Sequence, residues 1–220
     1  MYNIDDYYLY PNSSVLRNKF NIRFQSMLDE IESDMVTANI ANLISNPSVL
    51  GEQSFNFDYL KRIHQYLFQD VYEWAGEVKL QNTYKENISY TDIEDIEKRA
   101  NEIFLGVRVL NMFYPGMEQT EFCEKGGELL YDIHSLHPFR EGNSRTERTY
   151  MLLLGQRCKV DLDYSAINRM DWQMTIIKAN KNKSYVPFSD FLQKACNAAE
   201  LRKIGKLGDE NIVEEDGPMV

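Results

Sequence analysis

Hydrophobic residues recur at helical spacing along most of the chain. The clearest stripe follows an i, i+3, i+4 pattern and consists of Leu60, Ile63, His64, Leu67, Phe68, Val71 and Tyr72. This spacing predicts a helix from about 57 to 74 with one buried face. Gly76 follows this stretch as a stop signal.

The same periodicity predicts helices in further stretches, at about 23–45, 93–110, 122–133, 144–157, 165–179 and 188–203. In the first of these, the predicted buried stripe is Leu28, Ile31, Met35 and Ala38. Pro115-Gly116 ends the second and Pro138 ends the third, because proline cannot continue a helix.

Residues 77–90 break the helical pattern. Val78 and Leu80 alternate with polar residues, and residues 85–87 are polar, which indicates a short β-hairpin. We therefore predict an all-α fold, a bundle of about seven or eight helices that carries one hairpin. The 220 residues fit a single domain, placed at 1–200, and the acidic stretch 205–220 predicts a disordered tail.

Composition narrows the classes of partner. The chain has 24 Lys and Arg against 34 Asp and Glu, a net charge of −10. This balance argues against direct binding to nucleic acid, which depends on basic residues that neutralise phosphates. The sequence has no apolar run of the roughly 18 residues that a membrane span needs. Its three cysteines are widely spaced and form no Cys-x-x-Cys pair, which favours reduced thiols and a cytoplasmic location.

Residues 137–148 hold the densest set of reactive side chains, in the order His-Pro-Phe-Arg-Glu-Gly-Asn-Ser-Arg-Thr-Glu-Arg. Pro138 stops the preceding helix, so His137 lies at a helix end. A new helix is predicted to begin at about Asn143 or Ser144. The N-terminus of a helix presents free backbone N–H groups and a partial positive charge, which together favour phosphate.

The charged side chains of this segment fit a polyphosphate site. Arg145 and Arg148 share one side of the first turn, where the helix dipole disfavours cations unless they bind an anion. Glu141 is a hard oxygen ligand suited to Mg²⁺, and His137 is the candidate general base. Each residue alone also fits a structural role or a surface ion pair. It is their combination within twelve residues that indicates chemistry.

The segment resembles the motif of the Fic family, His-x-Phe-x-(Asp/Glu)-Gly-Asn-Gly-Arg-x-x-Arg, and differs from it only at Ser144, where the motif has Gly. Residues 10–19 and 63–77 are also similar to family elements, the second being the helix that leads into the family's flap. The resemblance covers roughly 10–195. It implies the Fic fold and, by the character of the N-terminal block, the antitoxin-regulated, toxin-like branch.

The resemblance implies a protein adenylyltransferase. In Fic enzymes the motif histidine deprotonates a Tyr, Ser or Thr hydroxyl of a target protein. The hydroxyl then attacks the α-phosphate of ATP, and Mg-pyrophosphate leaves. Carried over by position, His137 is the base and Glu141 binds Mg²⁺.

The nucleotide-binding residues that the resemblance implies are Gly142, Asn143, Ser144, Arg145 and Arg148. The backbone of 142–144 would form the anion hole, with Asn143 orienting the α-phosphate region, and the two arginines would bind the β- and γ-phosphates. Residues 77–90 correspond to the flap, which holds the target segment by strand addition. Lys85 and Tyr90 are its expected target contacts.

Ser144 leaves the transferred group open. A side chain costs about 1 kcal/mol where glycine adopts a positive φ. The related Doc toxins carry Lys at this position and phosphorylate their target. The alternatives are therefore another nucleotidyl or phosphoryl transfer, or a catalytically weak module that binds ATP or a peptide.

The resemblance also implies a regulator and a target. Many Fic proteins are inhibited by a helix with the pattern Ser/Thr-x-x-x-Glu-Gly/Asn, whose Glu pairs with the second motif arginine, here Arg148. Outside the motif, Glu86-Asn87 and Glu210-Asn211 lack the Ser or Thr four residues earlier. Ser26 and Glu30 have the spacing, but Ile31 follows them where the pattern has Gly or Asn. We therefore expect a small antitoxin in trans, with DNA gyrase and topoisomerase IV as family targets. Secretion as an effector is compatible with the resemblance.

Two other interpretations concern histidine and tyrosine. His64, His134 and His137 could suggest zinc, but zinc needs a third close ligand, and His64 lies in an apolar stripe that is typical of a core residue. Three tyrosines near the N-terminus, Tyr7, Tyr8 and Tyr10, could stack on a nucleotide base, although such residues more often pack in the core.

Overall fold

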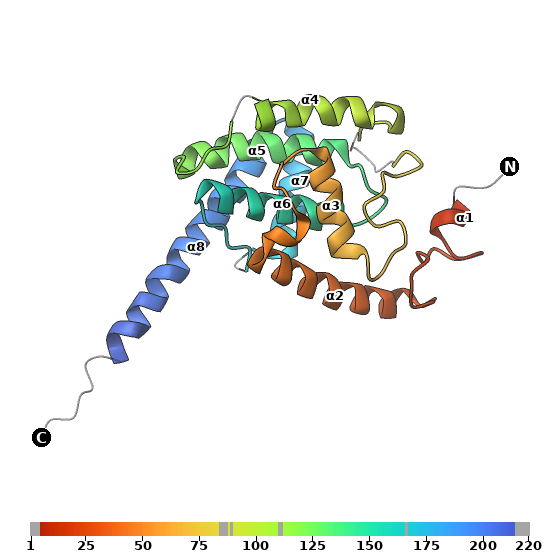
Figure 1. The fold of residues 1–220 in the computed structure, drawn as a ribbon, viewed down its shortest axis with the longest axis horizontal. Coiled ribbons are helices and arrows are strands. Elements are labelled where there is room, and N and C mark those ends of the chain that lie inside the picture. Colours follow the sequence, from red (N-terminus) through yellow and green to blue (C-terminus); the bar gives the residue numbers. More distant parts are fainter. Residues whose placement is uncertain (1–4, 84–87, 89, 110–111, 166, 214–220) are drawn as a thin grey trace, which may run out of the picture. The chain divides into compact units, whose positions relative to one another are not determined.

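The computed structural model describes residues 5–83, 88, 90–109, 112–165 and 167–213 (Figure 1). The predicted all-α fold is confirmed. The elements are α1 (Asp5–Tyr8), α2 (Gln25–Ser45), η1 (Pro47–Leu50), α3 (Phe57–Phe68), η2 (Ile93–Asp95), α4 (Ile96–Val109), α5 (Gln119–Leu136), α6 (Asn143–Cys158), α7 (Arg169–Asn182) and α8 (Val186–Val213), where η marks a 3-10 helix. No helix among these residues is both long and apolar enough to cross a bilayer.

The chain forms two compact units. The first comprises residues 1–112 and 132–154, and the second comprises residues 113–131 and 155–220. The predicted site residues that the structure describes all lie in the first unit. That 1–200 behaves as a single domain stays a prediction.

Helix α3 is shorter than the periodicity predicts. It begins after Asn56, whose side chain accepts a hydrogen bond from the Tyr59 backbone, and it ends at Phe68 instead of residue 74. The pattern continues past its end because Val71 and Tyr72 are buried from a turn, in which both backbone N–H groups donate to the Phe68 carbonyl. The apolar spacing therefore continues from the helix into a buried turn, and it does not show where the helix ends.

The buried face of helix α2 matches the predicted stripe only in part, because Leu28 is buried but Ile31 and Met35 are half-buried. Its buried residues are Leu28, Glu32, Val36 and Leu43, whereas Ala38 of the predicted stripe is exposed. The buried face includes the charged residue Glu32, whose carboxylate is bound by Arg145 and Tyr72. A charged residue can occupy a core position when its charge is paired, and the apolar pattern alone does not reveal such a pair.

The predicted hairpin at 77–90 lies partly outside the described residues, which exclude 84–87 and 89 and therefore Lys85. Of the described residues, Ile88 takes part in a β-bridge and 77–83 run through bends and loop. The Lys79 backbone donates to the carbonyl of Pro138 at 2.8 Å. This bond ties the segment to the start of the 137–148 loop.

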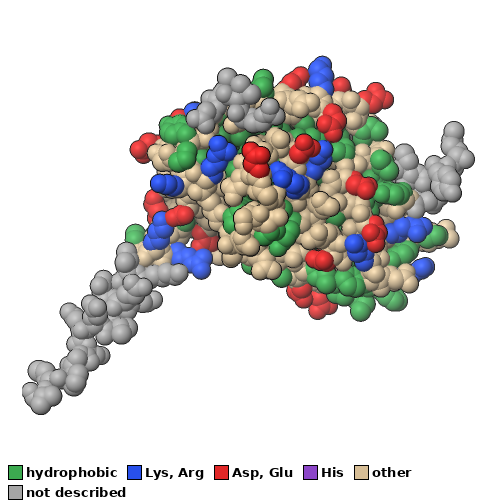
Figure 2. Space-filling view, in the orientation of Figure 1, with side chains coloured by type: hydrophobic (Ala, Val, Ile, Leu, Met, Phe, Trp, Pro, Cys, Tyr) green, Lys and Arg blue, Asp and Glu red, His purple; other side chains and the backbone are tan. Residues whose placement is uncertain are grey.

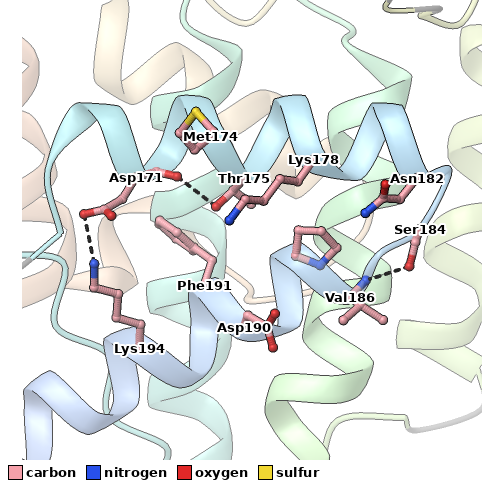
Figure 3. Close-up of a pocket in the computed structure, with 11 residues that line it drawn as sticks. Asp171, Met174, Thr175, Lys178, Asn182, Ser184, Val186, Asp190, Phe191 and Lys194 are labelled. Atoms are coloured by element: carbon pink, nitrogen blue, oxygen red, sulfur yellow. Dashed lines mark hydrogen bonds and ion pairs between the residues drawn. The ribbon is translucent and has the colours of Figure 1, made fainter.

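In the second unit, α7 and α8 pack against each other and line a cavity of about 550 Å³ (Figure 3). Lys194 on α8 pairs with Asp171 on α7 at 3.0 Å. Helix α8 continues through Val213, so the tail predicted to be disordered from 205 is helical as far as that residue.

Surface charges of both signs lie close together on the face drawn in Figure 2, where Lys and Arg side chains are interspersed with Asp and Glu. The three cysteines are buried free thiols.

Candidate active site

The loop at 137–142 joins two helices in the predicted way. Helix α5 ends at Leu136, and the His137 backbone N–H still donates to the Ile133 carbonyl at 3.2 Å. His137 then takes a left-handed conformation, with φ of 45°. Such a conformation is costly for a residue other than glycine and is concentrated at functional sites. It turns the chain out of α5 directly before Pro138.

The His137 imidazole is enclosed but not sealed. It is 7% exposed and lines a cavity of about 150 Å³. The Tyr90 ring stacks on one face of the imidazole, with centroids 3.8 Å apart and planes 20° apart. Nδ2 of Asn143 lies 3.4 Å from His137 Nε2. Burial raises the pKa of Tyr90 to about 12, with Glu147 adding to the rise, so this stacked ring is neutral at pH 7.

A buried ionisable pair, His134 and Glu147, lies next to the His137 imidazole. His134 Nδ1 and Glu147 Oε2 are 3.0 Å apart, and both residues are less than 4% exposed. The His134 ring meets His137 edge-on, with centroids 6.1 Å apart. Sequence reasoning assigned no role to Glu147, because the pair joins α5 to α6 and its members are thirteen residues apart. In the part of the chain that the structure describes, no three His, Cys, Asp or Glu side chains gather to hold a metal ion.

Asn143 and Gly142 fix the shape of the loop. Asn143 Oδ1 accepts from the Phe139 backbone at 3.0 Å, and its Nδ2 donates to the Phe139 carbonyl at 2.8 Å. Gly142 has φ of 83°, and a Cβ placed on it would lie 2.4 Å from the Phe68 ring. The Asn143 side chain is therefore engaged in holding the loop as well as lying next to His137.

His64 is buried, as predicted for a core residue, and its ring hydrogen-bonds to the loop that carries the site. Its Nδ1 accepts from the Gly76 backbone at 2.7 Å, which leaves the proton on Nε2 to donate to the Glu141 carbonyl at 3.0 Å. Its ring stacks on Phe139 with centroids 3.9 Å apart. Burial lowers the pKa of His64 from 6.5 to about 3.

We expect this depressed pKa to make stability depend on pH. Below pH 6.5 the unfolded chain protonates His64 while the folded chain does not, so the folded state binds fewer protons and loses stability as pH falls. One such group contributes a slope of up to about 1.4 kcal/mol per pH unit. Urea unfolding at several pH values from about 4.5 to about 7, all above the folded-state pKa of about 3, should show a smaller slope in His64→Asn than in the wild type. An unchanged slope would contradict the expectation.

The N-terminus of α6 faces the cavity, which is lined by Thr83, His137, Arg140, Glu141, Gly142, Asn143, Ser144 and Arg145. The helix begins at Asn143, so Ser144 is helical and is not among the residues with positive φ. The backbone penalty expected for serine here therefore does not arise. Its N–H belongs to the first turn, whose donors have no partner within the helix.

The two motif arginines differ in their placement. Arg145 lines the cavity, with its Cζ 4.7 Å above the Phe68 ring, its Nη1 2.6 Å from Glu32 and its Nη2 3.8 Å from Glu141. Arg148 is part-exposed and is not among the residues that line the cavity.

Of the three tyrosines near the N-terminus, Tyr8 and Tyr10 are core residues, whereas Tyr7 is exposed. Tyr8 is 2% exposed and Tyr10 is 7% exposed. The Tyr8 hydroxyl accepts from the Leu80 backbone at 3.0 Å, and the Arg140 guanidinium lies 5.6 Å from its ring centroid. Tyr8 thus connects the N-terminal segment to the loops around the site.

Known proteins resemble the chain in sequence and in structure. The model of the Fic/DOC family matches residues 54–154. A protein of Sinorhizobium fredii named Probable protein adenylyltransferase y4lH is 32% identical over 164 residues, which cover 74% of this chain and 82% of that protein. Protein adenylyltransferase VbhT of Bartonella schoenbuchensis is 30% identical over 175 residues. These are 80% of this chain but only 36% of VbhT, so the chain spans about a third of that relative.

The solved structures agree with the sequence matches. The BepC protein of Bartonella tribocorum, a VirB-translocated effector whose crystal structure holds AMPPNP, superposes with a TM-score of 0.81 at 24% identity, over 88% of this chain and 98% of that one. The two relatives are named as a protein adenylyltransferase and a probable protein adenylyltransferase, and the BepC structure shares the predicted fold. With sequence, fold and the 137–148 loop in agreement, the chain belongs to the Fic/DOC family.

Proposed function

We propose that the protein transfers AMP from ATP to a hydroxyl side chain of a target protein. The observation that carries the proposal is that the His137 imidazole, the N-terminus of α6 and the Arg145 guanidinium line one cavity. At about 150 Å³ this cavity is smaller than the roughly 300–1,000 Å³ of a pocket for a whole drug-sized ligand, so it fits the phosphates of a nucleotide. The names of the relatives support AMP as the transferred group.

The proposed reaction uses each group once. The N–H groups of residues 143 and 144 hold the α-phosphate oxygens, because the expected third donor, the Gly142 N–H, is bound by Glu141. Arg145 and Arg148 hold the β- and γ-phosphates. His137 takes the proton of the target hydroxyl as its oxygen attacks the α-phosphorus. The bond from that phosphorus to the oxygen bridging to the β-phosphate breaks, and pyrophosphate leaves with the electron pair.

Glu141 fits a role as the Mg²⁺ ligand. Its side chain is half-exposed at the cavity, and Oε1 accepts from the Gly142 backbone at 3.0 Å. One carboxylate with room for water suits Mg²⁺, which keeps several waters and bridges phosphates. When bound there, Mg²⁺ would neutralise charge on the departing pyrophosphate.

Incubation with ATP labelled at the α- or the γ-phosphate tests the proposal. We expect protein in a cell lysate, or the chain itself, to acquire label from the α-phosphate only, and Ser144→Gly to keep that selectivity because Ser144 is already helical. Transfer from the γ-phosphate would instead identify a kinase like the Doc toxins. ATP binding without any transfer would identify a binding module.

We also propose that the target segment docks along residues 77–90. Two contacts support this proposal: the Tyr90 ring stacks on the His137 imidazole, and the Lys79 backbone N–H donates to the Pro138 carbonyl. We further propose that a small antitoxin inhibits the protein in trans and that the target is DNA gyrase or topoisomerase IV. The same assay tests them, with purified topoisomerase subunits as acceptor and with the Ser/Thr-x-x-x-Glu-Gly/Asn helix as additive. An inhibitor in trans predicts that this helix lowers the transfer of label.

A further inference from the structure

A buried carboxylate stands next to the site on an element that the motif does not include. Glu32, in the middle of α2, is 9% exposed. Its Oε1 lies 2.6 Å from Arg145 Nη1, and its Oε2 accepts a hydrogen bond from the Tyr72 hydroxyl. Both oxygens are therefore engaged, one by a cation and the other by a neutral donor.

The surroundings explain why the carboxylate is tolerated there. Burial of a charge is costly unless the charge is paired and hydrogen-bonded. Tyr72 is 1% exposed, and burial raises its pKa, so its hydroxyl keeps its proton and remains a donor at neutral pH. The pair is thus built into the core between α2, the turn after α3 and α6.

Arg145 is held from three sides. Its guanidinium lies over the Phe68 ring, its Nη1 is bound by Glu32 and its Nη2 is 3.8 Å from Glu141. A guanidinium has five N–H donors in one rigid plane, so fixing one nitrogen orients the others. The donors that Glu32 leaves unused remain available to a ligand.

We infer that Glu32 is a positioning residue for Arg145, which it holds in the orientation that receives the nucleotide phosphates. Ordering an arginine on binding costs free energy, and an arginine that is already ordered avoids that cost. The inference rests on the proposed function, because it takes a nucleotide to be the ligand of this site. It concerns how tightly the nucleotide binds and not whether AMP is transferred.

Glu32 could either position Arg145 for the nucleotide or block it from binding the nucleotide. The side from which Glu32 contacts the guanidinium distinguishes these two roles. Arg145 lines the cavity, whereas Glu32 is not among its lining residues. The carboxylate therefore reaches the guanidinium from the protein side. A phosphate in the cavity can meet Arg145 without displacing Glu32, so the pair does not have to break when the nucleotide binds.

The test removes the charge of Glu32 and keeps its shape. In Glu32→Gln we expect the Kd for ADP and the KM for ATP to rise about tenfold, while kcat stays within about threefold, because a contact made equally before and during reaction alters KM. Tyr72→Phe, which leaves the carboxylate in place, should shift both constants in the same direction by about threefold. Glu30→Gln, on the exposed side of α2, is the matched control and should change neither.

A double-mutant cycle separates positioning from general stability. In an Arg145→Lys background we expect Glu32→Gln to raise the Kd for ADP by less than about twofold, because the residue through which it acts is already changed. A tenfold effect that persists in that background would overturn the inference, and so would tighter binding or faster transfer in Glu32→Gln. Calorimetry with ADP needs no turnover, so it gives its result even if the chain transfers no AMP.

Discussion

Replacing His137 by alanine should lower AMP transfer about a thousandfold and leave the Kd for ADP within about threefold of the wild-type value. General-base catalysis contributes roughly 10² to 10⁴ in rate, and the described site offers His137 as the base that lines the cavity. In the proposed mechanism the N-terminus of α6 and Arg145 hold the phosphates, and neither requires the imidazole. Initial rates with α-labelled ATP and calorimetry with ADP measure the two quantities separately.

The control for this variant is its fold. The imidazole stacks on Tyr90, so its loss removes a packing contact as well as a base. Tyr90→Leu removes the same stacking contact and keeps His137, so urea unfolding of both variants shows how much stability that contact contributes. If His137→Ala kept more than about a tenth of wild-type transfer, the base assignment would be contradicted.

Local signals in the sequence predicted most helices and the whole site loop. Pro138 and the turn before Asn143 mark the boundaries of α5 and α6, because backbone preferences there depend on neighbouring residues. The motif is contiguous, so its residues were certain to lie close together. Its placement of His137 at a helix end and of Ser144 in a first turn was confirmed.

The residues that sequence reasoning missed act across long separations. Glu32 and its partner Arg145 are 113 positions apart in the sequence. Glu32 also lies on helix α2, where the apolar pattern predicted a buried stripe that does not include it. Glu147 lies inside the motif but at an unspecified position, and its pairing with His134 depends on how α5 meets α6. A spacing rule describes one helix, whereas these pairs depend on the packing of two.

Gly142→Ala should both destabilise the protein and abolish most of its activity. The added Cβ would lie 2.4 and 2.5 Å from two atoms of the Phe68 ring, and φ at this position is 83°. Positive φ costs an alanine about 1–2 kcal/mol, and forcing extra volume into a packed site costs about 1–3 kcal/mol. Phe68 is the platform beneath Arg145, so a displaced ring also displaces the guanidinium.

Gly116→Ala separates these two causes. Gly116 has the same φ of 83°, but a Cβ there would meet no atom within 4 Å. We expect Gly116→Ala to lose only about 1–2 kcal/mol in urea unfolding and to keep full transfer, whereas Gly142→Ala should lose about 2–5 kcal/mol and at least about 90% of transfer. Equal losses in the two variants would mean that backbone conformation alone requires glycine at 142. The larger loss at Gly142 would show that the site needs the chain to approach Phe68 more closely than any side chain allows.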